Sequence, residues 1–285
     1  MGASQEAGIA AFRRSIRIQP GRRGLAHELH ELWEYRELFG FLVWRDIKVR
    51  YVQTVLGPVW AVIVPVLQMI VFTVIFQRIG GIQGEYHVPY PIFVFAGLLP
   101  WQYFSTSLGQ SGKSVVSNTN LVTKVYVPRL MLPLASIAVP VVDFLIAFLV
   151  LCVLFVRYQY TPHWHTVVSP FFLGLALLNA FGVGLWLSAL NVRYRDIPYV
   201  IPLLTQLWLF ASPVIYGASF IPPRWHWLIA LNPMTGAIDG FRWAVLGRGE
   251  PHYGLFATSA AVGIFLMVTG LAYFRHAERQ FPDVI

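Results

Sequence analysis

Long apolar stretches recur along this chain, and their length limits what the chain can fold into. The hydrocarbon core of a bilayer is about 30 Å thick, so a helix needs about 20 apolar residues to cross it. Six stretches approach or exceed this length: 57–76, 90–108, 130–156, 167–190, 197–216 and 253–274. The sequence therefore predicts an all-α membrane protein whose six transmembrane helices lie in a domain spanning 51–285.

The composition agrees with a membrane protein and excludes an ordinary soluble domain. Of the 285 residues, 56% are hydrophobic and only 12% are charged, and the mean hydropathy is +0.60. A soluble domain carries about 25% charged residues, so this chain has too little polar surface to cover a globule in water. Its single cysteine, Cys152, excludes an internal disulfide and a cysteine-rich metal site.

The basic residues are unevenly shared between the two sides of the predicted spans. Most lie before the first span, between the second and third, between the fourth and fifth, or after the sixth: Arg13, Arg14, Arg17, Arg22, Arg23, Arg36, Arg45, Lys48, Arg50, Lys113, Lys124, Arg129, Arg193, Arg195, Arg275 and Arg279. The other side holds Arg78, Arg157, Arg224, Arg242 and Arg248. The positive-inside rule then predicts that both termini are cytoplasmic. The net charge of +8 is explained by this topology and requires no nucleic-acid partner.

Two segments outside the spans also show helical signals. After a polar, basic arm over 1–28, apolar residues recur at helical spacing through 29–50, with charged residues between them. This pattern predicts an amphipathic helix in the cytoplasmic interface, and a plain membrane anchor is the alternative. The segment 218–249 is semi-apolar and broken by prolines and glycines. It is too interrupted to cross the bilayer, so we expect short re-entrant helices in the outer leaflet.

Motifs for chemistry are sparse. Residues 109–114 (GQSGKS) resemble a phosphate-binding loop, but the position that requires the first glycine is Ser107, and the segment ends a predicted span instead of joining a strand to a helix. We therefore expect no cofactor in this chain, and any ATP and Mg²⁺ to be bound by another subunit. His163 and His165 lack a third ligand at suitable spacing, so no metal site is predicted.

Asp143 is the clearest ionisable residue inside a predicted span. Burying a carboxylate is costly, which makes a functional role one hypothesis. The alternative is a helix-packing contact with a polar residue such as Gln68, Asn179 or Gln206. One carboxylate cannot serve as both general acid and general base, so catalysis is not predicted here.

Aromatic residues make up 15% of the chain and gather at the ends of the predicted spans. Most fit the interfacial belt of membrane proteins. Six are candidates for lining a transport pathway, because aromatic faces can stack on sugar rings without holding them in one place: Trp101, Phe104, Phe181, Trp186, Trp208 and Phe210.

Four short motifs lie outside the predicted spans. Segments 118–129 (NTNLVTKVYVPR) and 191–198 (NVRYRDIP) fall on the predicted cytoplasmic side. Segment 232–242 contains NPMT and then GFR, and the chain ends in ERQFPDVI. From about residue 29 to 285, the chain resembles the permease subunit of polysaccharide-exporting ABC transporters. This is the type-2 exporter family that moves O-antigen, teichoic acid and capsule polymers.

The resemblance implies a homodimer in the bacterial inner membrane, with two copies of a separate ATP-binding-cassette subunit. Segment 29–50 would be the interface, or gate, helix, and 114–129 the coupling loop. The implied contacts with the ATPase are Asn118, Leu121, Lys124, Val125, Tyr126, Arg193, Arg195 and Asp196. The implied outer gate, within 218–249, includes Pro222, Trp225, Asn232, Pro233 and Arg242.

The resemblance also implies a glycan cargo linked to undecaprenyl pyrophosphate. Arg45, Lys48 and Arg50 are candidates for binding the anionic head, since they are charged donors near the cytoplasmic surface. The alternative is that these three cations only set the orientation of the chain in the membrane.

Other functions stay open at this point. A type-2 permease could move teichoic acid, capsule, a drug, haem or a lipid instead. A membrane-embedded glycosyl or acyl transferase would need acidic or histidine clusters near the membrane, whereas the outward carboxylates Glu85, Asp239 and Glu250 are sparse. A secondary transporter would need polar residues in symmetric halves, and Asp143 has no evident counterpart.

Overall fold

The computed structural model describes residues 25–52, 54–81, 84–124, 127–217, 220–279 and 281. Helices account for 83% of the structure, and these ranges contain no strand. The chain divides into two units, residues 1–36 and 37–285.

The first unit contains helix α2 (Leu25–Glu34). The predicted continuous helix over 29–50 is interrupted at Tyr35, and a second helix, α3 (Arg36–Val52), follows. Arg36 Nη1 donates a hydrogen bond to the carbonyl of Trp33 at 3.3 Å, and its guanidinium lies 5.6 Å from the centre of the Trp33 ring. A cation on the last carbonyls of a helix favours its ending there, which accounts for the break.

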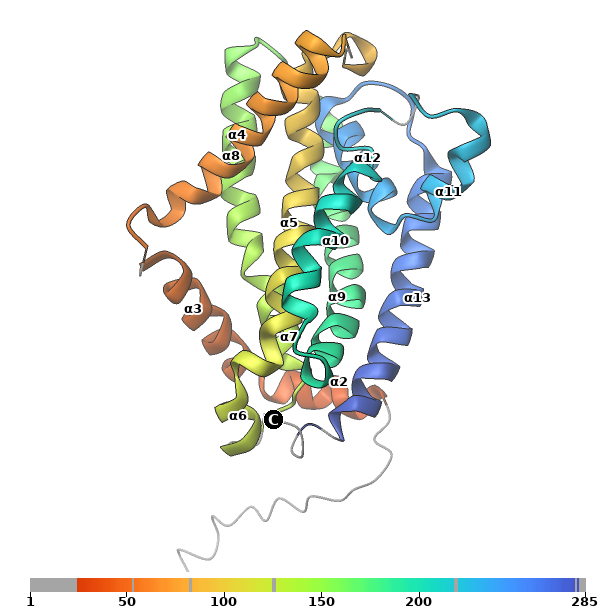
Figure 1. Cartoon of the computed structure of the whole chain (residues 1–285). Coiled ribbons are helices and arrows are strands. Elements are labelled where there is room, and N and C mark those ends of the chain that lie inside the picture. The colour runs from red at the N-terminus through yellow and green to blue at the C-terminus, as the bar shows by residue number, and fades with distance from the viewer. Residues whose placement is uncertain are drawn as a thin grey trace, which may run out of the picture. The chain divides into compact units, whose positions relative to one another are not determined.

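The second unit continues with α3 and then holds the long helices. Its elements are η1 (Gly57–Val59), α4 (Trp60–Phe72), η2 (Thr73–Ile79), η3 (Glu85–His87), α5 (Tyr90–Ser117), α6 (Thr119–Lys124), α7 (Met131–Ala138), α8 (Pro140–Arg157), η4 (Trp164–Val168), α9 (Ser169–Arg193), α10 (Ile197–Phe210), η6 (Pro223–Trp225), α11 (His226–Ala230), α12 (Pro233–Leu246) and α13 (Tyr253–Glu278). Figure 1 shows the long helices side by side, with α6 at one end of this unit and α11 and α12 toward the other.

Four helical stretches are long and apolar enough to cross a membrane: Gly57–Ile79, Met131–Arg157, Trp164–Arg193 and Tyr253–Glu278. They coincide with the first, third, fourth and sixth predicted spans, so a multi-pass membrane protein is confirmed. The predicted second span is α5, which is long but less apolar, and the predicted fifth is α10, which has only 14 residues.

Helix α5 is the centre of the second unit. It packs against α4, α7, α8, α9, α10 and α12 (Figure 1). Its residues from Ile92 to Leu99 are all buried. Small residues let α9 approach its second half: Ser111 lies where a Cβ on Gly184 would be, and Asn191 Nδ2 donates to the Gly112 carbonyl at 2.8 Å. Because its neighbours are protein, α5 carries serines and glycines that a lipid-facing helix would lack.

Helices α9 and α13 pack closely through glycines. A Cβ on Gly182 would lie 2.7 Å from the Met267 backbone nitrogen, and one on Gly270 would lie 2.6 Å from the Gly182 carbonyl oxygen. Close approach of two backbones at small residues is a common basis of helix association in membranes. These glycines therefore fix the spacing of the two helices.

The segment predicted to be re-entrant forms the helices α11 and α12. All of α12 except Trp243 is buried, against α5, α9 and α13. Asn232 caps its N-terminus by accepting from the Met234 N–H at 3.0 Å. The helix ends at Gly247, whose φ of 60° suits a left-handed cap. The capped, buried helix explains why this segment combines apolar residues with breakers, and its depth in a membrane stays a prediction.

The α9–α13 contact gives a first test. Gly182→Ala should lower the free energy of unfolding by about 1–3 kcal/mol, because the added methyl has backbone atoms on its far side that cannot rotate away. The measurement is an SDS-titration unfolding curve of the purified chain in mild detergent. Gly174→Ala, on the same helix with no heavy atom within 4 Å of its Cβ position, is the matched control. Equal unfolding curves for both variants would contradict the packing.

Candidate functional site

A cluster of charged and polar side chains joins α3 to the helix bundle. Arg50 Nη2 lies 2.5 Å from Asp143 Oδ2, and the Tyr51 hydroxyl donates to Asp143 Oδ1 at 2.5 Å. The Asp143 side chain is only 18% exposed, so its charge relies on these two partners. On α5, the Gln110 amide accepts from Arg50 Nη1 and donates to the Ser136 carbonyl at 3.0 Å. Residues of α3, α5, α7 and α8 thus meet at one carboxylate.

The partner of Asp143 differs from those that the sequence suggested. Gln68 accepts a hydrogen bond from Gln102 at 2.7 Å, and Asn179 donates to the Pro233 carbonyl at 2.7 Å. Neither reaches Asp143, whose partners come from α3. Burial and the hydrogen bond to Asp143 raise the pKa of Tyr51 above its usual range, so its hydroxyl stays protonated and can donate.

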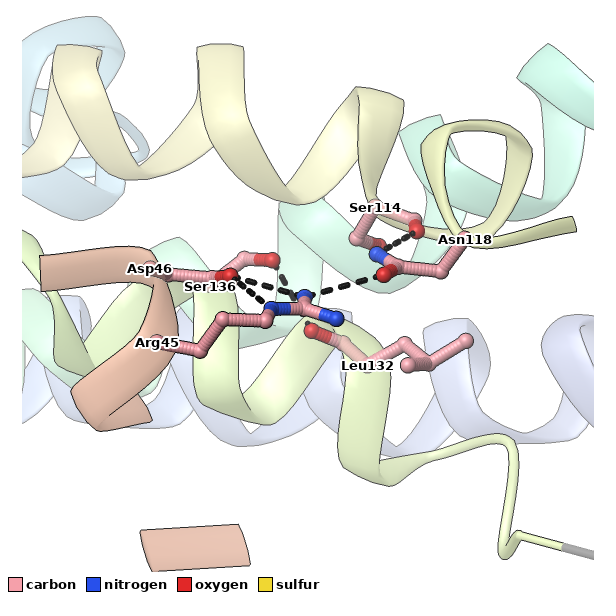
Figure 2. Close-up of polar contacts among 6 residues, drawn as sticks. All are labelled: Arg45, Asp46, Ser114, Asn118, Leu132 and Ser136. Carbon is pink, nitrogen blue, oxygen red and sulfur yellow. Dashed lines mark hydrogen bonds and ion pairs between the residues drawn. The ribbon is translucent and has the colours of Figure 1, made fainter. Parts of the chain in front are cut away.

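A second cluster lies one turn away along α3. Arg45 Nε donates to Asp46 Oδ1 at 2.8 Å, and Arg45 Nη2 donates to Asn118 Oδ1 at 2.9 Å. Asn118 in turn donates to the Ser114 carbonyl at 2.8 Å. Figure 2 shows the guanidinium between Asp46 of α3 and Asn118 at the end of α5, with the Ser136 hydroxyl bonded to the Leu132 carbonyl nearby. Arg45 therefore connects α3 to the junction of α5 and α6.

Two hollows beside these clusters share Arg50 and Thr106. The larger, an open cleft of about 720 Å³, is lined mainly by residues with polar side chains from α3, α5 and α7. The smaller, a pocket of about 330 Å³, is mainly apolar and is lined by α3, α4, α5 and α8. Arg50 stands where the polar cleft meets the apolar pocket.

The three predicted lipid-binding cations separate in the structure. Arg45 and Arg50 line the cleft, whereas Lys48 is exposed with its ammonium 5.3 Å from the centre of the Trp44 ring. Lys113 of α5 lines the cleft instead. From the sequence, Lys113 is only one of the basic residues on the predicted cytoplasmic side, because no linear pattern indicates that α3 folds back against that part of α5.

The predicted ATPase contacts lie at one end of the second unit. Asn118, Leu121 and Lys124 belong to the end of α5 and to α6, while Val125 and Tyr126 lie outside the described residues. The second set lies at the turn between α9 and α10: Arg193, Arg195 and Asp196. Figure 1 shows α6 and this turn at the same end of the bundle, and their role in binding an ATPase stays a prediction.

Arg129, at the end of the predicted coupling loop, is held by the C-terminal helix. Its Nη1 donates to the Glu278 carbonyl at 2.5 Å, and its guanidinium lies 5.9 Å from the centre of the Phe281 ring. Phe281 is itself buried against Phe274. The tail therefore anchors the loop that precedes α7.

The six candidate pathway aromatics occupy different environments. Trp101 and Phe104 are buried inside the chain, and Phe104 packs edge-on against Trp208 with ring centroids 5.2 Å apart. Trp186 stacks on Tyr273, and Phe181 is half-buried. Phe210 is 50% exposed. Only Phe210 presents a largely open ring in the single chain, and the pathway role of all six stays a prediction.

The predicted outer-gate residues form two groups. Asn232, Pro233 and Arg242 belong to the cap and interior of α12, whereas Pro222 and Trp225 are exposed near α11. Arg242 is almost fully buried. Its Nη2 donates to the Val214 carbonyl at 2.9 Å, and its guanidinium lies 3.8 Å from the centre of the Phe93 ring. Arg242 therefore ties α12 to α5 and to the turn after α10.

A titratable pair joins α12 to the start of α13. His252 Nδ1 lies 2.8 Å from Asp239 Oδ2, and Asp239 is 9% exposed. The hydrogen bond with Asp239 raises the pKa of His252 above its ordinary value, and partial burial opposes that rise. Sequence spacing alone does not indicate this contact, because His252 lies 13 residues after Asp239 and in another helix region.

The segment that resembles a phosphate-binding loop is helical. Residues 109–114 lie inside α5, where their backbone N–H groups bond along the helix and cannot cradle a phosphate. Among the described residues, no three His, Cys, Asp or Glu side chains gather as a metal site.

Comparison with known proteins agrees with these features. A family model described as ABC-2 type transporter matches residues 37–246. The chain belongs to this family. As an ABC-2 permease, it is similar to the O-antigen export system permease protein RfbA of Myxococcus xanthus, with 30% identity over 90% of this chain and 98% of that protein. It is 29% identical to RfbA of Klebsiella pneumoniae over 85% of this chain and 92% of that protein. It is 22% identical to the polysialic acid transport protein KpsM of Escherichia coli over 82% of this chain and 91% of that protein.

A double-mutant cycle tests the joint between α3 and α8 in this permease. Arg50→Gln and Asp143→Asn should each destabilise the chain, and their effects should be non-additive by about 1–3 kcal/mol, because each removes the other's partner. The measurement is unfolding free energy in detergent. Lys48→Gln combined with Asp143→Asn is the control cycle, with coupling below about 0.5 kcal/mol. Additive effects of Arg50 and Asp143 would contradict the ion pair.

The His252–Asp239 pair predicts a pH dependence of stability. Because the folded state raises the pKa of His252, the stabilisation is fully present below the unfolded pKa and is lost as the pH rises through the folded value. His252→Asn should therefore lower Tm more at pH 5.5 than at pH 9 when compared with the unchanged chain. A Tm difference that is the same at both pH values would show that the pair contributes nothing through its charge.

Proposed function

We propose that this permease forms the membrane pathway of an ABC exporter that moves an O-antigen-type polysaccharide, carried on undecaprenyl pyrophosphate, across the bacterial inner membrane. The observation that carries the proposal is similarity along 98% of the length of an O-antigen export permease. The polar cleft beside α3, with its cations next to an apolar pocket, suits a lipid with an anionic head. In this proposal, Arg45, Lys48 and Arg50 attract the pyrophosphate.

ATP hydrolysis resides in a partner subunit, and this chain is a transport subunit. The helix α6 and the turn at 193–196 are short, polar and placed at the same end of the bundle, which suits docking into a partner (Figure 1). Arg45 couples the α5–α6 junction to α3, and Arg50 couples α3 to Asp143 in α8. A push on α6 therefore reaches the bundle through two charged contacts, as rigid-body switching requires.

A second copy of the chain completes the pathway. The stretch Gly57–Ile79, which contains α4, has only 11% of its most apolar window buried within the chain, and apolar residues of α10 such as Leu203 and Leu207 are exposed. These faces are available to lipid or to a partner chain. In the dimer, the aromatic residues near α10 border the pathway and guide sugar rings through it.

The topology follows from the same proposal. Helices α5 and α10 complete six spans, with α5 shielded from lipid by its neighbours. Both termini are cytoplasmic, α3 lies at the cytoplasmic interface, and α11 and α12 form the outer gate as re-entrant helices. The buried cation Arg242 holds that gate to α5.

The function is tested by reconstitution with the cognate ATPase. Vesicles that contain both proteins should transfer a lipid-linked O-antigen glycan only when ATP is present. Transfer of polysialic acid, which the name of KpsM gives for that relative, or of a drug or lipid, would change the proposed cargo but leave the chain an ABC exporter permease. Glycosyl or acyl transfer by the purified chain without ATPase would overturn the proposal.

The coupling role gives a further prediction. Lys124→Glu should reduce recovery of the ATPase by about tenfold in pull-down from membranes, because it reverses the charge of an exposed residue on α6. Arg157→Glu, an equally exposed cation at the far end of α8, is the control and should leave recovery unchanged. If Lys124→Glu recovered as much ATPase as the unchanged chain, α6 would not be the element that docks to the ATPase.

A further inference from the structure

Asn232 lies where the end of α10 meets the start of α12. Its Oδ1 accepts from the Met234 N–H at 3.0 Å and from the Trp208 indole N–H at 3.0 Å. Its Nδ2 donates to the Ala211 carbonyl at 3.2 Å and to the Ser212 hydroxyl at 2.8 Å. A side-chain amide can accept two hydrogen bonds and donate two, so this amide uses its full capacity within the chain.

The Asn232 amide serves two helix ends at once. Met234 lies in the first turn of α12 and Ala211 directly follows α10, and at both places backbone groups lack a partner inside their own helix. Trp208 and Asn232 are 24 residues apart in the chain, so the peptide connection between the helices is long. The bonds of the amide therefore fix α12 relative to α10 more closely than the connection does.

Backbone packing leaves this link to side chains. Helix α12 packs mainly against α5, α9 and α13, whereas α10 packs against α5 and α9. Arg242 of α12 reaches the turn after α10 at the Val214 carbonyl, and Asn232 reaches α10 itself through Trp208. A displacement of α10 is therefore felt at the start of α12 through the Asn232 amide.

The other side of the same helix end is held by the bundle. The Pro233 carbonyl accepts from Asn179 Nδ2 of α9 at 2.7 Å and from the Ser259 hydroxyl of α13. Asn179 and Ser259 are both completely buried. The start of α12 is thus bound to α9 and α13 on one side and to α10 on the other.

Trp208 is engaged by protein through both its ring and its N–H. The ring packs edge-on against Phe104 of α5, which in turn contacts the Trp101 ring at 5.7 Å between centroids. The N–H is held by Asn232. A ring fixed at two points is poorly suited to follow a moving sugar, whereas Phe210 of the same helix is 50% exposed.

We propose that Trp208, Asn232, Ala211 and Ser212 form a joint that makes α12 follow α10, and that Trp208 is a positioning residue of the outer gate. This inference rests on the proposed function for the gate role of α12, and it narrows the sugar contact on α10 to Phe210. Four bonds to one amide fix both its position and its orientation, so α10 and the first turn of α12 shift together as a rigid body.

Two substitutions cut the joint from opposite sides and keep the local fold. Trp208→Phe retains an aromatic ring beside Phe104 and removes the N–H. Asn232→Asp retains an oxygen that caps α12 and removes the donors to Ala211 and Ser212.

Tyr160→Phe is the matched control. The Tyr160 hydroxyl donates to the Leu246 carbonyl at 2.6 Å, at the other end of α12. Its loss removes one hydrogen bond from the same helix without touching α10, so it separates the joint from a general loosening of α12.

The experiment reconstitutes the permease with its ATPase in vesicles and measures the glycan transferred per ATP hydrolysed. Trp208→Phe and Asn232→Asp should each lower this ratio about fivefold, as expected for the loss of a hydrogen bond at the joint. Tyr160→Phe should leave the ratio unchanged. A purely structural role would lower transfer and ATP hydrolysis in parallel, and an unchanged ratio in both joint variants would overturn the inference. A ratio lowered only by Trp208→Phe would assign Trp208 to the glycan and would also overturn it.

A second measurement needs neither glycan nor ATP, so the two proposals fail separately. In hydrogen-exchange mass spectrometry of the purified chain, the amides of 233–238 should exchange about fivefold faster in both joint variants, and those of α8 should be unchanged. If this occurs while the unchanged complex transfers no glycan, the joint stands and the exporter proposal fails. If the unchanged complex transfers glycan and both variants match it in ratio and exchange, the exporter proposal stands and the joint fails.

Discussion

A carboxylate set among apolar helices must find a partner, and Asp143 finds two on a helix that lies outside the membrane-spanning stretches. Arg50 and Tyr51 both reach it from α3, and Gln110 brings α5 to the same point. The cost of burying the charge is offset only while α3 stays in place. The position of α3, the shape of the cleft and the link to the α5–α6 junction all depend on this contact.

The second organising element is α5, whose character follows from its neighbours. It is surrounded by six other helices, so its Ser111 and Gly112 meet protein where a lipid-facing helix would need bulky apolar groups. Polar contacts such as that from Asn191 then fix its register against α9. Helix α5 has a composition poorly suited to lipid, and the other helices pack around it.

The sequence predicted the helical class and the position of each apolar stretch, because length and hydropathy are local properties. It could not find the partners of Asp143, since Arg50 is 93 residues away in the chain and belongs to a segment of mixed character. The helix break at Tyr35 was not predicted, because the apolar spacing continues through this residue. The break depends on the hydrogen bond from the Arg36 side chain to the Trp33 carbonyl, which the spacing of apolar residues does not indicate. The sequence also did not indicate that Lys113 lines the cleft, because this depends on α3 lying opposite that part of α5.

The central claim is that the contact of Asp143 with Arg50 and Tyr51 holds α3 against the helix bundle. Hydrogen-exchange mass spectrometry of the purified chain in detergent tests this directly, with the unchanged chain compared with Asp143→Asn. The exchange of the backbone amides of α3 should become faster in Asp143→Asn, while that of the α9 amides stays the same. Equal protection of α3 in the two proteins would contradict the account.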